Sequence, residues 1–142
     1  MFPTSQALIY FEHTRYLIIL SLSRNVAVIG AGMTRFHHKE HATKQSREMF
    51  VEAALEASES VDNGFNLKDS NALYLGYFSS DMFEKQGHTS ALMADALGIN
   101  PVPATRVEAA CASSGAAVNM GIMAIASGLY DVVMIGGVEK MR

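Results

Sequence analysis

Hydrophobic and polar positions form two kinds of alternating segment after residue 25. Short runs that are mostly apolar predict strands at residues 26–30, 72–77, 104–110 and 131–137, the first of them buried on both faces. Apolar residues at helical spacing predict helices at 45–61, 87–97 and 112–127. Because strands and helices alternate, the sequence predicts an α/β fold of βαβαβαβ order around a mainly parallel or mixed sheet.

The predicted helix at residues 112–127 is apolar around its whole circumference. Such a helix has to be buried on all sides, yet one sheet can cover only one face of it. It is also too short to cross a membrane, and Gly115 and Gly121 interrupt it. The sequence therefore predicts a further covering layer, supplied by another chain or by a part of the protein outside these residues.

The first 24 residues differ from the rest. Two apolar runs, at residues 7–11 and 16–22, are separated by polar residues, and each is far shorter than the ~20 residues of a membrane span. The segment also lacks the basic start and the cleavage site of a secretory signal. We interpret residues 1–24 as an extension of unknown role, with a short extra strand as one option, and expect no membrane association.

Composition narrows the class of protein. The chain has 142 residues, 49% of them apolar, and a net charge of -3, as expected of one globular domain. Basic residues form no stripe, so nucleic acid is not an expected partner. A single cysteine excludes an internal disulfide and a cysteine-based zinc cluster, and it fits a reducing compartment, so we expect a cytoplasmic protein.

Two motifs have simpler interpretations than a ligand site. His37, His38 and His41 lack a set of further metal ligands, so we interpret them as a solvated loop and expect no metal. Gly30 and Gly32 follow a predicted strand, but Arg35 stands where a dinucleotide fingerprint needs its third glycine. We expect these glycines to turn the chain out of the sheet.

Cys111 is the candidate catalytic residue. It lies between a strand-like run and a helix of small residues. The unpaired N–H groups and the dipole at a helix start favour a thiolate there. A lone cysteine in an apolar run can also be a buried hydrophobic residue, and position by itself leaves both interpretations open.

Three ordered motifs resemble the amino-terminal half of thiolases. They are residues 26–36 (VAVIGAGMTRF), 107–115 (VEAACASSG) and 130–141 (YDVVMIGGVEKM). The similarity is greatest to the branch of sterol-carrier-protein-type thiolases and archaeal acetyl-CoA acetyltransferases. It implies that residues 25–142 are a thiolase amino-terminal domain without the carboxy-terminal half, in a fold that stacks two similar halves with the nucleophile's helix in the middle layer.

The resemblance implies acyl transfer through a covalent acyl-cysteine. Cys111 would attack an acyl-CoA thioester, and a deprotonated acetyl-CoA would then attack the acyl-enzyme, giving a 3-ketoacyl-CoA; thiolysis is the reverse. The Cys111 N–H is expected to donate into an oxyanion hole. Coenzyme A enters as substrate, and no metal or bound cofactor is implied.

Other residues of the family's site have no counterpart here. Thiolases use a Gly-His-Pro histidine, a Cys-x-Gly cysteine and an Asn-Glu-Ala-Phe-like asparagine from the carboxy-terminal half. In this chain the last histidine, His88, precedes Cys111 and is followed by Thr89, and there is no second cysteine. We therefore expect the 142-residue chain to be inactive by itself.

Two alternative functions remain open, and the resemblance also implies partner proteins. A ketoacyl-synthase-like condensing enzyme shares the fold and the cysteine at a helix start, although residues 136–141 favour a thiolase. The other alternative is a non-catalytic fragment that binds a partner or assists assembly. By resemblance we expect a homodimer or tetramer, associated with a hydroxymethylglutaryl-CoA synthase and a small zinc-ribbon and OB-fold protein.

Overall fold

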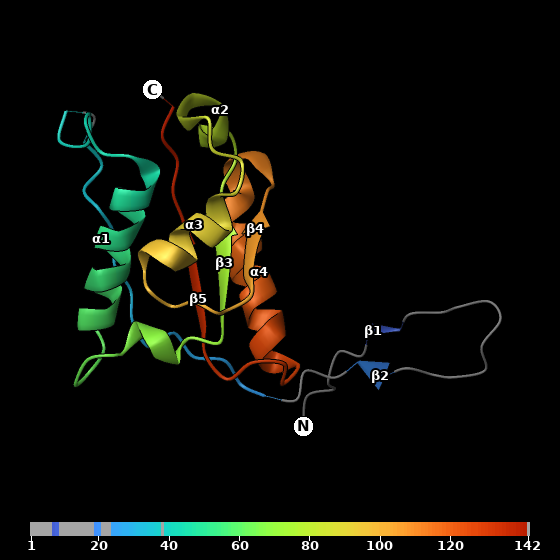
Figure 1. Cartoon of the computed structure of the whole chain (residues 1–142). Helices are drawn as coiled ribbons and strands as arrows, with labels where there is room; N and C mark the ends of the chain where they lie inside the picture. Colours follow the sequence, from blue (N-terminus) through green and yellow to red (C-terminus); the bar gives the residue numbers. More distant parts are fainter. Residues whose placement is uncertain (1–6, 9–18, 21–23, 38, 142) are drawn as a thin grey trace.

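A parallel three-stranded sheet lies at the centre of the molecule (Figure 1). The computed structural model describes residues 7–8, 19–20, 24–37 and 39–141. In this part of the chain β3 (Ala72–Gly76) is the central strand, flanked by β4 (Ala104–Val107) and β5 (Val133–Gly137). β3 pairs with β5 in parallel along its whole length, from Ala72 opposite Val133 to Gly76 opposite Gly137.

Helices cover both faces of this sheet (Figure 1). α1 (Ser46–Glu59) and α3 (Thr89–Ala96) lie on one face, and α4 (Ser113–Ala126) lies on the other. α2 (Ser80–Glu84) follows β3 at the carboxyl edge of the sheet. The predicted α/β fold with a mainly parallel sheet is confirmed.

The central strand β3 supplies side chains to two separate cores. Leu73 and Leu75 pack with Phe50 of α1 and Met93 of α3, whereas Ala72 and Tyr74 pack toward α4. Successive residues of a strand point to opposite faces, which explains the alternation. Both leucines are fully buried, and each contributes about 1.5–3 kcal/mol of burial free energy.

The predicted helices and three of the predicted strands are present, with small shifts at their ends. α3 and α4 end where glycine was expected to stop them, since Gly98 and Gly128 have positive φ angles of 67° and 82°. Three short elements were not predicted: α2 and the 3₁₀ turns Leu67–Asp69 and Ala110–Ala112. Segments of three to five residues are too short to produce a periodic pattern.

The predicted buried strand at residues 26–30 is wrong. The segment belongs to no strand, and Val28 is 88% exposed. β3 and β5 pair directly, so the segment is not inserted between them. It lies along α1 instead, where the N–H groups of Ala31 and Met33 donate to Ser60 Oγ at 2.9 Å and Glu56 Oε2 at 3.0 Å.

Close approach to α1 explains the two glycines of this segment. A Cβ atom on Gly30 would collide with the carbonyl oxygen of Ala57, and one on Gly32 with that of Ala53. The expectation that these glycines turn the chain out of the sheet is wrong, because the segment is not in the sheet and the glycines instead allow it to approach α1. They do not form a dinucleotide-binding turn.

The outward face of α4 carries large apolar side chains with substantial exposure. Val118, Ile122 and Met123 are 46%, 39% and 54% exposed. The opposite face is made of small residues and packs on the sheet, with Ala117 and Gly121 buried. Residues 24–37 and 39–141 do not cover the outward face, in agreement with the prediction of a further layer.

Little of the amino-terminal extension can be described. Its described residues form an antiparallel pair between β1 (Ala7–Leu8) and β2 (Ile19–Leu20). The other residues up to position 23 lie outside the described part of the chain. None of the helices in the described residues has the length and apolar character needed to cross a membrane.

Glycines at the carboxyl ends of β3 and β5 let α4 begin directly against the sheet. A Cβ atom on Gly76 would lie 2.6 Å from both the N and Cα atoms of Ser114. A Cβ atom on Gly137 would collide with the Ser114 side chain. The backbone of the first turn of α4 therefore occupies the space where other residues would place a side chain.

Gly76→Ala tests this contact. The added methyl group meets backbone atoms, which cannot rotate away, so we expect a loss of about 1–3 kcal/mol in the free energy of unfolding. Urea unfolding followed by circular dichroism measures it. Gly115→Ala is the matched control, because no atom lies within 4 Å of its added Cβ and alanine favours a helix by up to about 1 kcal/mol over glycine. Equal stability of the two variants would contradict the close contact.

Candidate active site

Cys111 lies at the turn between β4 and α4. It is the middle residue of the 3₁₀ turn Ala110–Ala112, which leads directly into α4, and it is exposed. The described residues therefore do not bury the Cys111 side chain. An exposed thiol at a helix start is accessible to an electrophile from solution.

The turn before Cys111 is held in an unusual backbone conformation. Ala110 has a φ angle of 48°, in the left-handed region that non-glycine residues rarely adopt. Ser113 is buried, and its Oγ accepts from the Ala109 N–H at 2.9 Å and donates to the Ala110 carbonyl at 2.7 Å. The Ala110 N–H donates to Glu108 Oε1 at 2.6 Å. Such a conformation persists because surrounding contacts impose it, and it is typical of functional sites.

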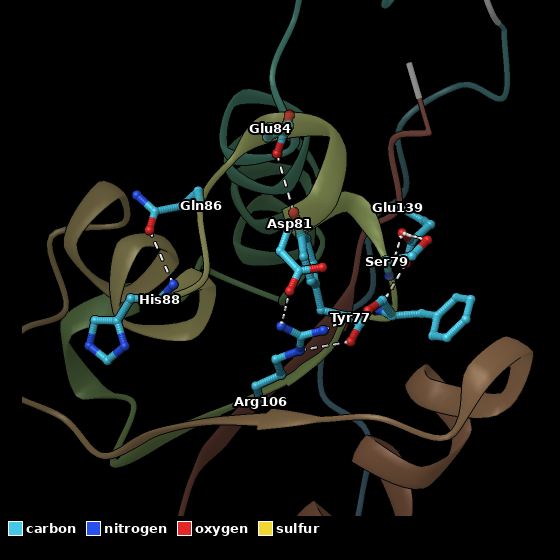
Figure 2. A network of polar contacts seen from close by, with 9 residues as sticks. Tyr77, Ser79, Asp81, Glu84, Gln86, His88, Arg106 and Glu139 are labelled. Atoms are coloured by element: carbon cyan, nitrogen blue, oxygen red, sulfur yellow. Dashed lines mark hydrogen bonds and ion pairs between the residues drawn. The ribbon is translucent and has the colours of Figure 1, made fainter.

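At the carboxyl edge of the sheet, Arg106 and Glu139 hold the segment that follows β3 (Figure 2). Arg106 donates to the carbonyl oxygens of Tyr77, at 3.1 Å, and Phe78, at 2.5 Å. Glu139 accepts from the N–H groups of Phe78, at 2.9 Å, and Ser79, at 3.0 Å. Since Arg106 lies in β4 and Glu139 follows β5, all three strands are linked at their carboxyl ends.

An ion pair extends this network to α2 (Figure 2). Arg106 Nη1 lies 2.8 Å from Asp81 Oδ2, and both side chains are about one-quarter exposed. The guanidinium also lies 5.2 Å from the centroid of the Tyr77 ring. The hydrogen bond from Arg106 lowers the pKa of the Asp81 carboxyl, and the charge of Arg106 adds to the shift.

The histidines singled out in the sequence have structural contacts. His37 Nδ1 accepts from the Glu40 N–H at 3.3 Å, and His41 Nε2 lies 2.6 Å from the Arg35 carbonyl oxygen. His38 lies outside the described residues. His88 is exposed in the turn before α3, as expected of a polar residue at a helix start.

Clustered metal ligands or a cavity could also mark a ligand site in the described residues. Among them, no three His, Cys, Asp or Glu side chains lie together as metal ligands would. A cavity of about 380 Å³ lies at the opposite edge of the sheet, next to Asn71 and Val102, which precede β3 and β4. The cavity thus lies away from the Cys111 turn, which follows the carboxyl end of β4.

Sequence reasoning identified Cys111 and missed the residues that support it. Ser113 and Glu139 lie inside the family-like motifs, so the motifs marked them without revealing their contacts. Arg106 carried one weak signal, a charged residue in a predicted strand. Its partners at positions 77, 78 and 81 depend on the pairing of β3 with β4, which a single sequence does not specify.

Ser113→Ala is expected to loosen the turn that carries Cys111. The substitution leaves the Ala109 N–H and the Ala110 carbonyl without their partner, and such a loss costs about 1–3 kcal/mol. Urea unfolding measures the stability, and the rate of Cys111 alkylation by iodoacetamide measures the placement of the thiol. Ser114→Ala, at the exposed neighbour, is the control. Unchanged stability and alkylation in Ser113→Ala would contradict this role.

The Asp81–Arg106 pair should make stability depend on pH in the acid range. Because the folded state lowers the pKa of Asp81, the pair contributes its full stability above about pH 4, the ordinary range of an aspartate pKa. That contribution is lost as pH falls through the folded-state pKa. The difference in urea midpoint between the wild type and Asp81→Asn should therefore shrink from pH 7 to pH 3. A constant difference would show that Asp81 is not the titrating group.

Comparison with known proteins identifies relatives of this chain. The family model described as "Thiolase, N-terminal domain" matches residues 26–142. An acetyl-CoA acetyltransferase of Methanothermobacter thermautotrophicus is 50% identical over 118 residues, which cover 83% of this chain and 30% of that protein. The corresponding protein of Methanocaldococcus jannaschii is 44% identical over 118 residues, covering 83% of this chain and 29% of its own length.

The chain thus spans less than one-third of the length of these relatives. The matched region contains the Cys111 turn, the Arg106 and Glu139 contacts and all three strands of the central sheet. The boundary that we predict between residues 24 and 25 stays a prediction. The family match and the two relatives agree with the motifs around Cys111, and this chain belongs to the thiolase family.

Proposed function

We propose that this chain is the nucleophile-bearing part of a thiolase-type acyltransferase that takes acetyl-CoA as a substrate. The observation that carries the proposal is the exposed Cys111 thiol on its constrained turn at the start of α4. The names of the two relatives support acetyl-CoA as the substrate class. The match to a thiolase model favours this reaction over that of a ketoacyl synthase.

The first step forms a thioester on Cys111. The thiolate attacks the carbonyl carbon of acetyl-CoA, a sulfur–carbon bond forms, and the carbon–sulfur bond to coenzyme A breaks. The thiolate of coenzyme A leaves and takes up a proton. N–H groups at the start of α4, that of Cys111 included, are the proposed donors to the oxyanion of the tetrahedral intermediate.

The second step transfers the acetyl group to carbon. A second acetyl-CoA loses a proton from its methyl carbon, and the carbanion attacks the acyl-cysteine, releasing the Cys111 thiolate and acetoacetyl-CoA. This step needs a base, and the sequence has no second cysteine to serve as one. We therefore propose that the 142-residue chain accepts an acetyl group but does not complete the reaction by itself.

The surroundings of the enzyme are proposed from resemblance. They comprise a cytoplasmic location, a homodimer or tetramer, and association with a hydroxymethylglutaryl-CoA synthase and a zinc-ribbon and OB-fold protein. The exposed apolar face of α4 supports the need for a covering layer. Chemical cross-linking in cell extract would test the partners separately from the chemistry.

Acetylation of Cys111 is the direct test. After incubation of the 142-residue chain with acetyl-CoA, we expect a slow mass increase of one acetyl group, located on Cys111 by peptide mapping. Cys111→Ser should lose this adduct, because a serine alkoxide forms far less readily than a thiolate. Thiolysis of acetoacetyl-CoA should stay at background in both proteins.

Other outcomes have distinct meanings. An adduct that persists in Cys111→Ser would identify a different nucleophile. Strong thiolysis by the chain alone would contradict its proposed incompleteness. A wild-type chain that takes up no acetyl group, although iodoacetamide modifies Cys111, would favour the non-catalytic assembly role.

A further inference from the structure

Two successive peptide groups after β3 are clamped between opposite charges. In the Tyr77–Phe78 peptide, the carbonyl accepts from Arg106 Nε and the N–H donates to Glu139 Oε2. In the Phe78–Ser79 peptide, the carbonyl accepts from Arg106 Nη2 and the N–H donates to Glu139 Oε1. Charge-assisted hydrogen bonds of this kind are stronger than neutral ones. The backbone on both sides of Phe78 is therefore firmly held.

The alternation of β3 places Phe78 on the same face of the sheet as α4. Leu73, Leu75 and Tyr77 belong to the core beneath α1 and α3, while the Gly76 position faces Ser114 of α4. The Tyr77 N–H still donates to Val107 of β4 at 3.1 Å, so the strand-like conformation continues beyond Gly76. The next residue in the alternation, Phe78, falls on the α4 side.

Phe78 and Cys111 both lie close in sequence to the point where the sheet and α4 meet through backbone atoms. Gly76 and Ser114 touch at the carboxyl edge of the sheet. Phe78 continues from Gly76 past that edge, and Cys111 lies in the turn that joins the carboxyl end of β4 to α4, two residues before the helix begins at Ser113. Both residues therefore leave the contact in the same direction, which brings the Phe78 ring toward the side of the thiol.

Phe78 is 42% exposed, although the two peptide groups that flank it make four hydrogen bonds. The clamp fixes the backbone on both sides of Phe78, so the ring can change its place only by rotating about its own side-chain torsions. We propose that Phe78 is a specificity-determining residue, which bounds the space before the Cys111 thiol and disfavours long acyl groups. Arg106 and Glu139 are its positioning residues. The selection between acyl groups rests on the proposed function, whereas the location of Phe78 near the thiol does not depend on it.

Two ratios test the proposal on the 142-residue chain. The first compares acylation of Cys111 by acetyl-CoA and by hexanoyl-CoA, followed by intact mass. The second compares alkylation of Cys111 by N-methylmaleimide and by N-phenylmaleimide, which needs an accessible thiol and no enzyme activity. In Phe78→Ala we expect both ratios to fall by about tenfold through faster reaction of the larger reagent, a typical discrimination for a hydrophobic site. Phe78→Leu should be intermediate.

Matched variants distinguish an effect of the Phe78 side chain on the two ratios from an effect of general destabilisation. Leu129→Ala removes another exposed apolar side chain, beyond the far end of α4, and should change neither ratio. Glu139→Gln should shift both ratios in the direction of Phe78→Ala, but it should have no further effect when combined with Phe78→Ala. A merely structural role of Glu139 would not depend on the residue at position 78.

Each result decides between the two proposals. Unchanged ratios in Phe78→Ala, with Cys111 acylated normally, would overturn the role of Phe78 and leave the proposed function standing. A shifted maleimide ratio without any acylation would support the position of Phe78 and overturn the proposed function. A change in sedimentation with both ratios unchanged would assign the ring to a protein contact and overturn the proposal.

Discussion

The close contact between the first turn of α4 and the ends of β3 and β5 determines how the rest of the site is arranged. Gly76 lets the sheet meet the backbone of Ser114, and Gly137 leaves room for the Ser114 side chain. The chain must therefore turn sharply between β4 and α4, and the turn leaves Ala110 in a left-handed conformation with Cys111 exposed next to it. The exposed thiol is a consequence of this tight packing.

At the carboxyl edge of the sheet, charged side chains mainly hold the backbone of the segment that follows β3. Arg106 and Glu139 belong to segments on either side of β3, and each bonds two successive peptide groups. Asp81 partly neutralises Arg106 and links α2 to the same network. This arrangement differs from an ion pair on the surface, which contributes little to stability, because here the charges satisfy main-chain groups that leave the sheet without strand partners.

The sequence predicted those features that depend on local pattern. The apolar period gave the main helices, glycines marked their ends, and the motif around Cys111 located the candidate nucleophile. The strand at residues 26–30 was predicted wrongly, because its apolar pattern does not specify a partner and β5 pairs with β3 directly. The clamp around Phe78 was missed for the same reason: Arg106 meets its partners only after strand pairing has brought distant residues together.

The small residues on the inner face of α4 have a consequence for the entropy of the site. Ala117 and Gly121, like Gly76 and Gly137 opposite the helix start, have no side-chain torsions. Further along the helix Gly121 packs on the Ile135 side chain, but at the helix start the contact with Gly76 is made by main-chain atoms, so few rotamers have to be frozen there. The first turn of α4, which carries the thiol, is thus positioned at a low conformational cost.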